Sequence, residues 1–350
     1  MRSQQQQYLS EKHLLLPIAS KSPVPPERQR WRNSSKFVKG SALLVVAAMA
    51  ALLLNPLVTA LQTVLQTSQR PMYCHQPPEF EYTPEPGIWH ADPSKVHAIE
   101  LEVKGASSGG ITLSTSPSAT TITAEAHFRL SSEELIPDIH VTAVTTSSGT
   151  FQFTVETPGR LDGRCILSDV RLTLPTSLTE RLALNVKGRN AFIKVEDMAN
   201  LQFGGAELTT INGAIDIVKT INGADIGLQT TNGAIQGDVI STTSFKATTK
   251  NGGIRLSFPS SDEHPKTISV HTTNGAAHVS LPDSFSGRFA ASAKLGRVSV
   301  EGNDLHFDDS GSPGRFPGIG GRRTGWKGAE NGEQKVEVGA VNGAAAIIFI

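Results

Sequence analysis

The sequence predicts an all-β protein: a single-stranded β-solenoid of about 20 residues per coil, preceded by one transmembrane helix and a disordered N-terminal tail. Three observations lead to this prediction. Short runs of alternating apolar and polar residues dominate from about residue 96, Asn-Gly pairs recur at a regular spacing, and one long N-terminal segment carries no charge. Alternation is typical of strands, and a constant period is typical of stacked structural repeats.

The composition excludes several classes of protein. The 350 residues include 32 Lys and Arg against 32 Asp and Glu, so a strongly basic nucleic-acid-binding protein is not expected. A hydrophobic content of 38% is enough to fill a core. Two cysteines are too few for a disulfide-rich scaffold or a four-cysteine zinc site.

Residues 1–39 are predicted to be a disordered basic tail on the cytosolic side of a membrane. They contain eight basic residues against two acidic ones, together with a Gln4–Gln7 run and a proline cluster. They show no sustained apolar period, and such composition cannot bury enough apolar surface to fold.

Residues 40–68 are predicted to form the transmembrane helix. No charged residue occurs among them. Residues 41–65 supply the roughly 20 apolar residues that a helix needs to cross the hydrocarbon core, and they are expected to contact the membrane lipid. The alternatives are a signal peptide cleaved near Val58-Thr59-Ala60 and a buried helix of a soluble domain. The basic flank places the N-terminus in the cytosol and the C-terminal domain in the extracellular space or a lumen.

Both cysteines follow the predicted span, on the side where a disulfide can persist. We expect Cys74 and Cys165 to pair; two unrelated thiols are the alternative. Residues 69–95 are predicted to be a stalk or linker, because they are rich in proline.

Residues 96–350 are predicted to form the solenoid. Variants of the phrase Thr-x-Asn-Gly-Ala-Ile recur, and a strand-like segment follows each of them. Glycine permits a left-handed corner, and asparagine side chains can bond from coil to coil. A meander of hairpins with Asn-Gly turns is the alternative. The predicted structural corners are Asn212, Gly213, Asn222, Gly223, Asn232, Gly233, Asn251, Gly252, Asn274, Gly275, Asn342 and Gly343.

This phrase, recurring after a membrane segment, resembles the putative-adhesin domain of bacterial and fungal surface proteins. The resemblance covers residues 180–350 well and residues 95–180 loosely. It implies a β-solenoid with an adhesive or scaffolding role, and it carries over no catalytic residues.

Residues 303–334 interrupt the repeat and are predicted to be a flexible loop inserted between strands, because they are rich in glycine and proline. Long loops of this kind are often functional or disordered. The segment contains a basic and aromatic set suited to an acidic glycan or a protein partner; a loop without a ligand is the alternative. The set is Arg315, Arg322, Arg323, Trp326 and Lys327.

No catalytic or metal site is expected, and no cofactor. Residues 105–109 fit the pattern G-x-S-x-G, but a strand rather than a helix follows them. His264, His271 and His278 recur every seven residues, and in a β region this spacing places successive histidines on opposite faces, which does not favour a shared metal ion.

We therefore expect a non-catalytic, membrane-anchored adhesion or interaction protein that binds carbohydrate or protein through a repetitive face. One alternative is a scaffold that self-associates through its uncapped last coil, Ala345–Ile350. The other is a β-helix carbohydrate-active enzyme with an unrecognised site.

Overall fold

A computed structural model describes residues 78–178, 181–260, 265–308 and 320–350, all within the unit Met72–Ile350. These residues form strands almost throughout, with two short 3-10 helices, η1 (Pro93–Lys95) and η2 (Glu133–Asp138). The all-β prediction is confirmed. The predicted tail 1–39 and transmembrane helix 40–68 lie outside the described residues. Within the described ranges, no helix is long and apolar enough to cross a membrane.

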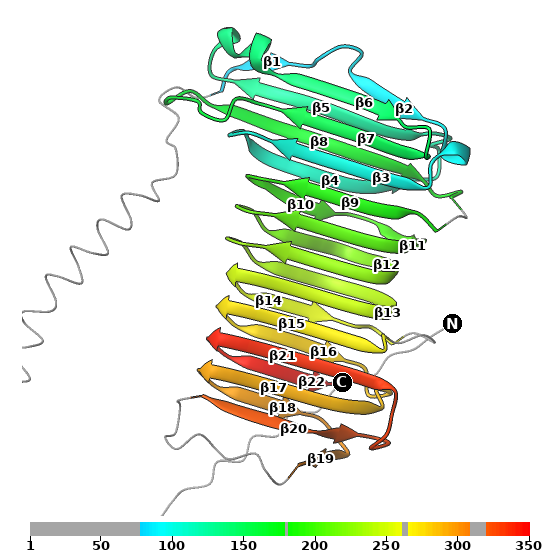
Figure 1. Ribbon diagram of the computed structural model, residues 1–350, viewed down its shortest axis with the longest axis vertical. Helices are drawn as coiled ribbons and strands as arrows, with labels where there is room; N and C mark the ends of the chain where they lie inside the picture. Colours follow the sequence, from blue (N-terminus) through cyan, green and yellow to red (C-terminus); the bar gives the residue numbers. More distant parts are fainter. Residues whose placement is uncertain (1–77, 179–180, 261–264, 309–319) are drawn as a thin grey trace, which may run out of the picture. The chain divides into compact units, whose positions relative to one another are not determined.

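The strands form two hydrogen-bonded ladders, here called face A and face B (Figure 1). Face A is, in spatial order, β6 (His140–Thr145), β7 (Thr150–Glu156), β3 (Ala98–Lys104), β9 (Ala183–Gly188), β11 (Met198–Thr210), β12 (Ile215–Thr230), β13 (Ile235–Asn251), β15 (Thr267–Asn274), β21 (Gln334–Asn342), β17 (Gly287–Leu295), β20 (Gly321–Lys327) and β19 (Leu305–Phe307).

Face B begins with two short strands that both pair with β5, and it includes the first parts of β12 and β13. Its order is β1 (Phe80–Tyr82) and β2 (Ile88–Ala91), β5 (Ile122–Leu130), β8 (Ile166–Pro175), β4 (Ser108–Ser116), β10 (Ala191–Val195), β12, β13, β14 (Ile254–Ser257), β16 (Ala277–Leu281), β22 (Ala345–Phe349) and β18 (Val298–Glu301).

One coil of the chain consists of a strand in face A, a tight corner and a strand in face B. Neighbouring coils pair in parallel and in register: Ile215 lies beside Ile235, which lies beside Ile254. Alternate side chains of both faces point inward and are buried in a single apolar cluster. The alternation seen in the sequence therefore follows from one face of each strand meeting the core while the other meets solvent.

The spatial order of the coils departs from the sequence order at both ends. The coil β3–β4 lies between β7–β8 and β9–β10, and the coil β21–β22 lies between β15–β16 and β17–β18. Antiparallel strands flank the parallel coils: β5 and β6 at one end, β20 and β19 at the other. These short outer strands cover edges that would otherwise pair with other chains.

The C-terminal strand is not an edge, so the prediction of an exposed last coil at Ala345–Ile350 is wrong. Strand β22 is hydrogen-bonded to β16 on one side and to β18 on the other. The reason is that β17 and β18 precede β21 and β22 in the sequence but lie beyond them in the stack.

Two predicted irregular segments contain strands. The end of the predicted stalk, residues 69–95, forms β1, β2 and η1, and Trp89 packs edge-on against Phe153 with ring centroids 5.2 Å apart. The predicted loop 303–334 contains β19 and β20, which pair with each other, and β20 also pairs with β17. Both corrections share a physical reason: prolines and glycines punctuate short edge strands as readily as loops.

Candidate functional site

Five of the six predicted corner asparagines, together with Asn190, form one continuous ladder along the stack. Each Nδ2 donates to the Oδ1 of the asparagine in the preceding coil, at 2.7–2.8 Å. The ladder begins at Asn190, whose Nδ2 donates to the Gly105 carbonyl at 3.3 Å. Each bond uses up one donor and one acceptor, so these side chains hold the coils together. The ladder runs Asn190, Asn212, Asn232, Asn251, Asn274 and Asn342.

The threonine two residues before the asparagine is also structural. The buried hydroxyl of Thr230 donates to the Gly213 carbonyl at 2.8 Å, and the hydroxyl of Thr249 donates to the Gly233 carbonyl at 3.0 Å. Thr210 and Thr272 make the equivalent bonds. The hydroxyl thus supplies a hydrogen bond to a corner carbonyl that has no partner in the strand ladders.

The corner glycines are required mainly by crowding between coils. A Cβ at Gly233 would collide with the backbone carbonyl of Gly213, and the same collision recurs along the stack at Gly252, Gly275 and Gly343. The left-handed backbone expected from the sequence is therefore not the common cause. The phrase Thr-x-Asn-Gly encodes a hydroxyl bond, an amide ladder and a close backbone approach.

Asn222 and Gly223 lie apart from this ladder. They belong to β12, between two register shifts, where the chain crosses from face B back to face A. Among the described residues, the buried Oδ1 of Asn222 has no hydrogen-bond partner.

Cys165 is buried and disulfide-bonded. Cys74 lies outside the described residues, so the pairing of the two stays a prediction.

The predicted basic and aromatic loop residues divide between two sides of β20. Arg322 and Trp326 lie on the outer surface of face A, opposite Ser292 and Arg288 of β17. Arg323 lies on the other side, with its guanidinium 5.9 Å from the Phe307 ring. Arg315 lies outside the described residues.

Lys327 is buried on strand β20 instead of being exposed on a loop, and its predicted contact role stays a prediction. Its side chain is 4% exposed, and its Nζ lies 2.9 Å from Asp283 Oδ1 and donates to the Asn303 carbonyl at 3.3 Å. The Lys327 ammonium also lies 5.9 Å from the centroid of the Phe349 ring.

Three side chains on neighbouring strands form a row that we call the outer row: His306, Trp326 and Arg288. The imidazole and indole rings are stacked, with centroids 5.3 Å apart and an angle of 13° between planes. The Arg288 guanidinium lies 6.0 Å from the Trp326 ring and donates to both oxygens of Asp308 at 3.2 Å. Stacking and ion pairing hold these side chains in fixed positions.

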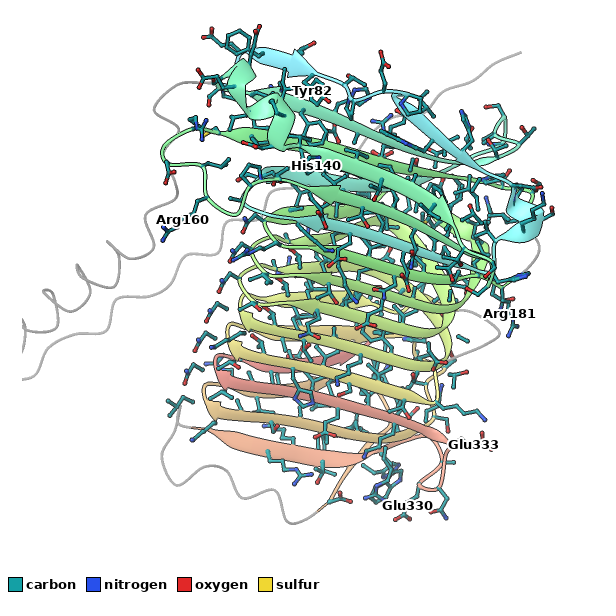
Figure 2. The ribbon with its side chains drawn as sticks, turned by 45° about the horizontal axis from the view of Figure 1, so that its top comes forward. Tyr82, His140, Arg160, Arg181, Glu330 and Glu333 are labelled. Carbon is teal, nitrogen blue, oxygen red and sulfur yellow. The ribbon has the colours of Figure 1, made fainter. Side chains whose placement is uncertain are left out.

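A groove of about 700 Å³ lies beside the outer row, within the usual range for ligand sites. Its walls include Arg322 of β20, Lys335 of β21 and the carboxylates of Asp308 and Glu333. Figure 2 shows Glu330 and Glu333 at this end of the strand stack, and Glu330 lies 3.8 Å from Arg288. The groove therefore offers cations and anions, and the outer row beside it adds aromatic side chains.

Arg288 and His306 could not be identified from the sequence, because only the strand pairing brings them beside Trp326. The sequence gives only a weak signal for a binding residue here. Arg288 occupies an outward position of an alternating strand, and charged side chains at such positions are ordinarily just solvated.

The G-x-S-x-G pattern lacks the helix that follows the serine in a nucleophile elbow. Ser107 of the G-x-S-x-G pattern is 3% exposed, and strand β4 follows it directly. Within the described ranges, no group of three or more His, Cys, Asp or Glu side chains could hold a metal ion.

A family model described as a domain of unknown function (DUF7330) matches residues 169–306. No curated protein matches the sequence. Similar solved structures include a putative cell adhesion protein from Clostridium sporogenes, at 14% identity over 77% of this chain and 99% of that chain, with a TM-score of 0.32. A putative adhesin from Parabacteroides merdae is 11% identical over 77% and 96%, with a TM-score of 0.36. One from Parabacteroides distasonis is 12% identical over 78% and 98%, with a TM-score of 0.32.

Proposed function

We propose that the stacked coils are a β-solenoid that serves a non-catalytic, membrane-anchored adhesion or interaction protein. The observation that carries the proposal is the outer row beside its groove. Tryptophan and arginine are the side chains that most often dominate binding energy at interfaces. Here they lie on the solvent side of face A, already oriented by stacking and an ion pair.

The rest of the stack supplies a rigid support. Because β19, β20, β17 and β21 are paired side by side at this end of the stack, the outer row loses little freedom when it binds. A carbohydrate or a protein surface suits the mixture of cations, carboxylates and aromatic rings. The alternative of a carbohydrate-active enzyme would need a pair of acidic groups on facing positions, and the outer row uses its nearby carboxylates in ion pairs.

The anchoring and location are part of the proposal. The uncharged residues 40–68 are the proposed span, and the disulfide at Cys165 suits an oxidising compartment such as the cell exterior or a lumen. Peptide mapping without reduction should recover Cys165 linked to Cys74. Recovery of Cys165 linked to another chain would contradict the single-chain pairing.

Self-association remains the second function to test, but not through β22. The scaffold would have to use outer strands such as β6 or β18, each of which pairs with one neighbour in face A or B. A concentration-dependent mass of the full chain would favour it.

Binding is tested with the full chain purified in a detergent without sugar headgroups and applied to an array of oligosaccharides and peptides. Trp326→Ala and Arg288→Ala should each weaken the array signal about tenfold, a typical loss at an interface hot spot. Val144→Ala is the control, because Val144 is a 56% exposed apolar side chain on β6 at the opposite end. Equal signals from all four proteins would refute a binding role for the outer row.

A further inference from the structure

A second groove, of about 620 Å³, lies on the outer surface of face B near its other end. It crosses strands β10, β4, β8, β5 and β1, and Tyr82, labelled in Figure 2, lies at its margin. We infer that this groove binds a neutral carbohydrate. The inference builds on the proposed binding role but concerns a different site from the outer row.

The floor of the groove carries an aromatic ring laid flat on the sheet. Phe192 of β10 lies opposite Gly110 of β4 and is 48% exposed. A Cβ added at Gly110 would meet Cζ of the ring first and both Cε carbons equally, at 2.8 Å, so the ring covers the glycine with one face. The other face is turned to solvent.

An upward-facing ring suits the apolar side of a pyranose. The face of an aromatic ring is negatively polarised, and it attracts positively polarised hydrogens such as the C–H groups of a sugar. A phenylalanine at an outward strand position would ordinarily be free to change rotamer. Here Gly110 leaves the space that lets the ring lie down, so the platform is formed before a ligand arrives.

Polar side chains stand on the neighbouring strands. Asp169 of β8 lies beside Gly110, and His127 of β5 lies beside Asp169. Adjacent strands are about 5 Å apart, so these groups reach the rim of a ring stacked on Phe192. Within the described part of the chain, the side chains of Arg129, Asp169 and Arg171 make no hydrogen bond or ion pair. Their donors and acceptors are free for sugar hydroxyls.

The charge of the groove decides the class of sugar. The lining holds three cations and three anions, so it offers no net field to a uronate, sulfate or phosphate group. The Lys194 ammonium is also held by Glu196 at 2.8 Å. A neutral oligosaccharide needs both donors and acceptors and gains nothing from excess charge. The six side chains are Arg129, Arg171, Lys194, Glu81, Asp169 and Glu196.

The test measures calorimetric binding of cellohexaose, laminarihexaose, mannohexaose and chitohexaose to the full chain in a sugar-free detergent, with hyaluronan hexasaccharide as the acidic probe. At least one neutral probe should bind and the acidic probe should not. Phe192→Ala should weaken the binding about tenfold, as expected for loss of an aromatic contact at the centre of a site. Phe192→Trp should retain it.

Gly110→Ala provides a second variant that removes no binding group. The three atoms nearest to the added methyl group all belong to the Phe192 ring, so the methyl group should lift the ring and weaken binding. The midpoint of thermal unfolding should stay near that of the parent protein. Added to Phe192→Ala, it should cause no further loss, because both changes act on one platform.

Three outcomes would overturn the inference. These are no binding of any neutral probe, binding unchanged by Phe192→Ala, and preference for the acidic probe. Neutral-sugar binding lost in Trp326→Ala but not in Phe192→Ala would overturn it and leave the proposed function standing. Loss in Phe192→Ala alone, with no array signal that depends on Trp326, would support this groove and refute the outer row.

Discussion

The adjacent glycines Gly252 and Gly253 allow the packing account to be tested at neighbouring positions. A Cβ at Gly252 would collide with the Gly233 carbonyl oxygen, with the carbonyl carbon at 2.5 Å and the Ala234 nitrogen at 3.2 Å. A Cβ at Gly253 would meet only the Ala276 oxygen, at an ordinary 3.5 Å. We therefore predict opposite effects for the same one-methyl change.

Gly252→Ala should destabilise the protein by about 3–5 kcal/mol. Overpacking against backbone costs roughly 1–3 kcal/mol, and two hydrogen bonds at Gly252 add about 1 kcal/mol each when the coil shifts. Those bonds run from the Gly252 nitrogen to the Asn274 carbonyl at 2.9 Å and from the Thr272 hydroxyl to the Gly252 carbonyl at 2.8 Å. The midpoint of thermal unfolding should fall by about 5–9 °C.

Gly253→Ala should be neutral or stabilising by about 0.4–1 kcal/mol, because alanine restricts the unfolded chain. Alanine already occupies the equivalent corner position at Ala214, Ala234 and Ala276. Circular dichroism melts of the two variants and the parent protein give the comparison. Equal melting temperatures for the two variants, or a larger loss in Gly253→Ala, would refute the close-approach reasoning.

Three further predictions follow from single contacts. Thr249→Val keeps the shape of the side chain but leaves the Gly233 carbonyl without its 3.0 Å hydrogen bond, so the free energy of unfolding in urea should fall by about 1–3 kcal/mol. Thr249→Ser, which keeps the hydroxyl, should lose less stability, and identical unfolding midpoints for the two variants would contradict this reasoning. The hydrogen bond from Lys219 lowers the pKa of Asp197 below its ordinary 3.8, so the pair stabilises the fold fully above pH 3.8, and this stabilisation is lost as the pH falls through the lowered pKa. In Lys219→Met, carboxyl NMR should show that the pKa of Asp197 rises toward 3.8. An unchanged pKa would exclude the contact. Ile348→Asp should leave the sedimentation mass unchanged, since β22 lies between two strands; dissociation of an oligomer would restore the edge hypothesis.

The repeat phrase made most of the corners predictable, because its threonine, asparagine and glycine make the same contacts in successive coils from β11 to β15. The hydrogen-bonded asparagines are 22, 20, 19 and 23 residues apart, which is the length of one circuit. The spacing between neighbouring repeats was enough to predict these corners, since each coil contacts only its neighbours.

The order of the last coils was not predicted, because β17 and β21 share the same alternation. The sequence holds one clue. Asn342 continues the ladder from Asn274 at 2.7 Å, whereas the equivalent residue in the earlier coil is Leu295, which cannot bond. Following the ladder instead of the chain would have placed β21 beside β15.

The grooves could not be predicted for a related reason. Phe192, Gly110 and Asp169 lie far apart in the sequence and meet only through strand pairing. An outward phenylalanine in a strand is unremarkable alone, since single exposed apolar residues are common. What distinguishes it is the glycine beneath it.

The topology of the full chain tests the proposed adhesive role most directly. An epitope tag placed after Ile350, on a protein that resists alkaline extraction from membranes, is exposed to protease outside intact cells. We predict loss of the tag on intact cells, or, if the protein resides in an organelle, protection until that membrane is opened. Cleavage in sealed organelles whose cytosolic face is exposed would place the stacked strands in the cytosol and contradict the account.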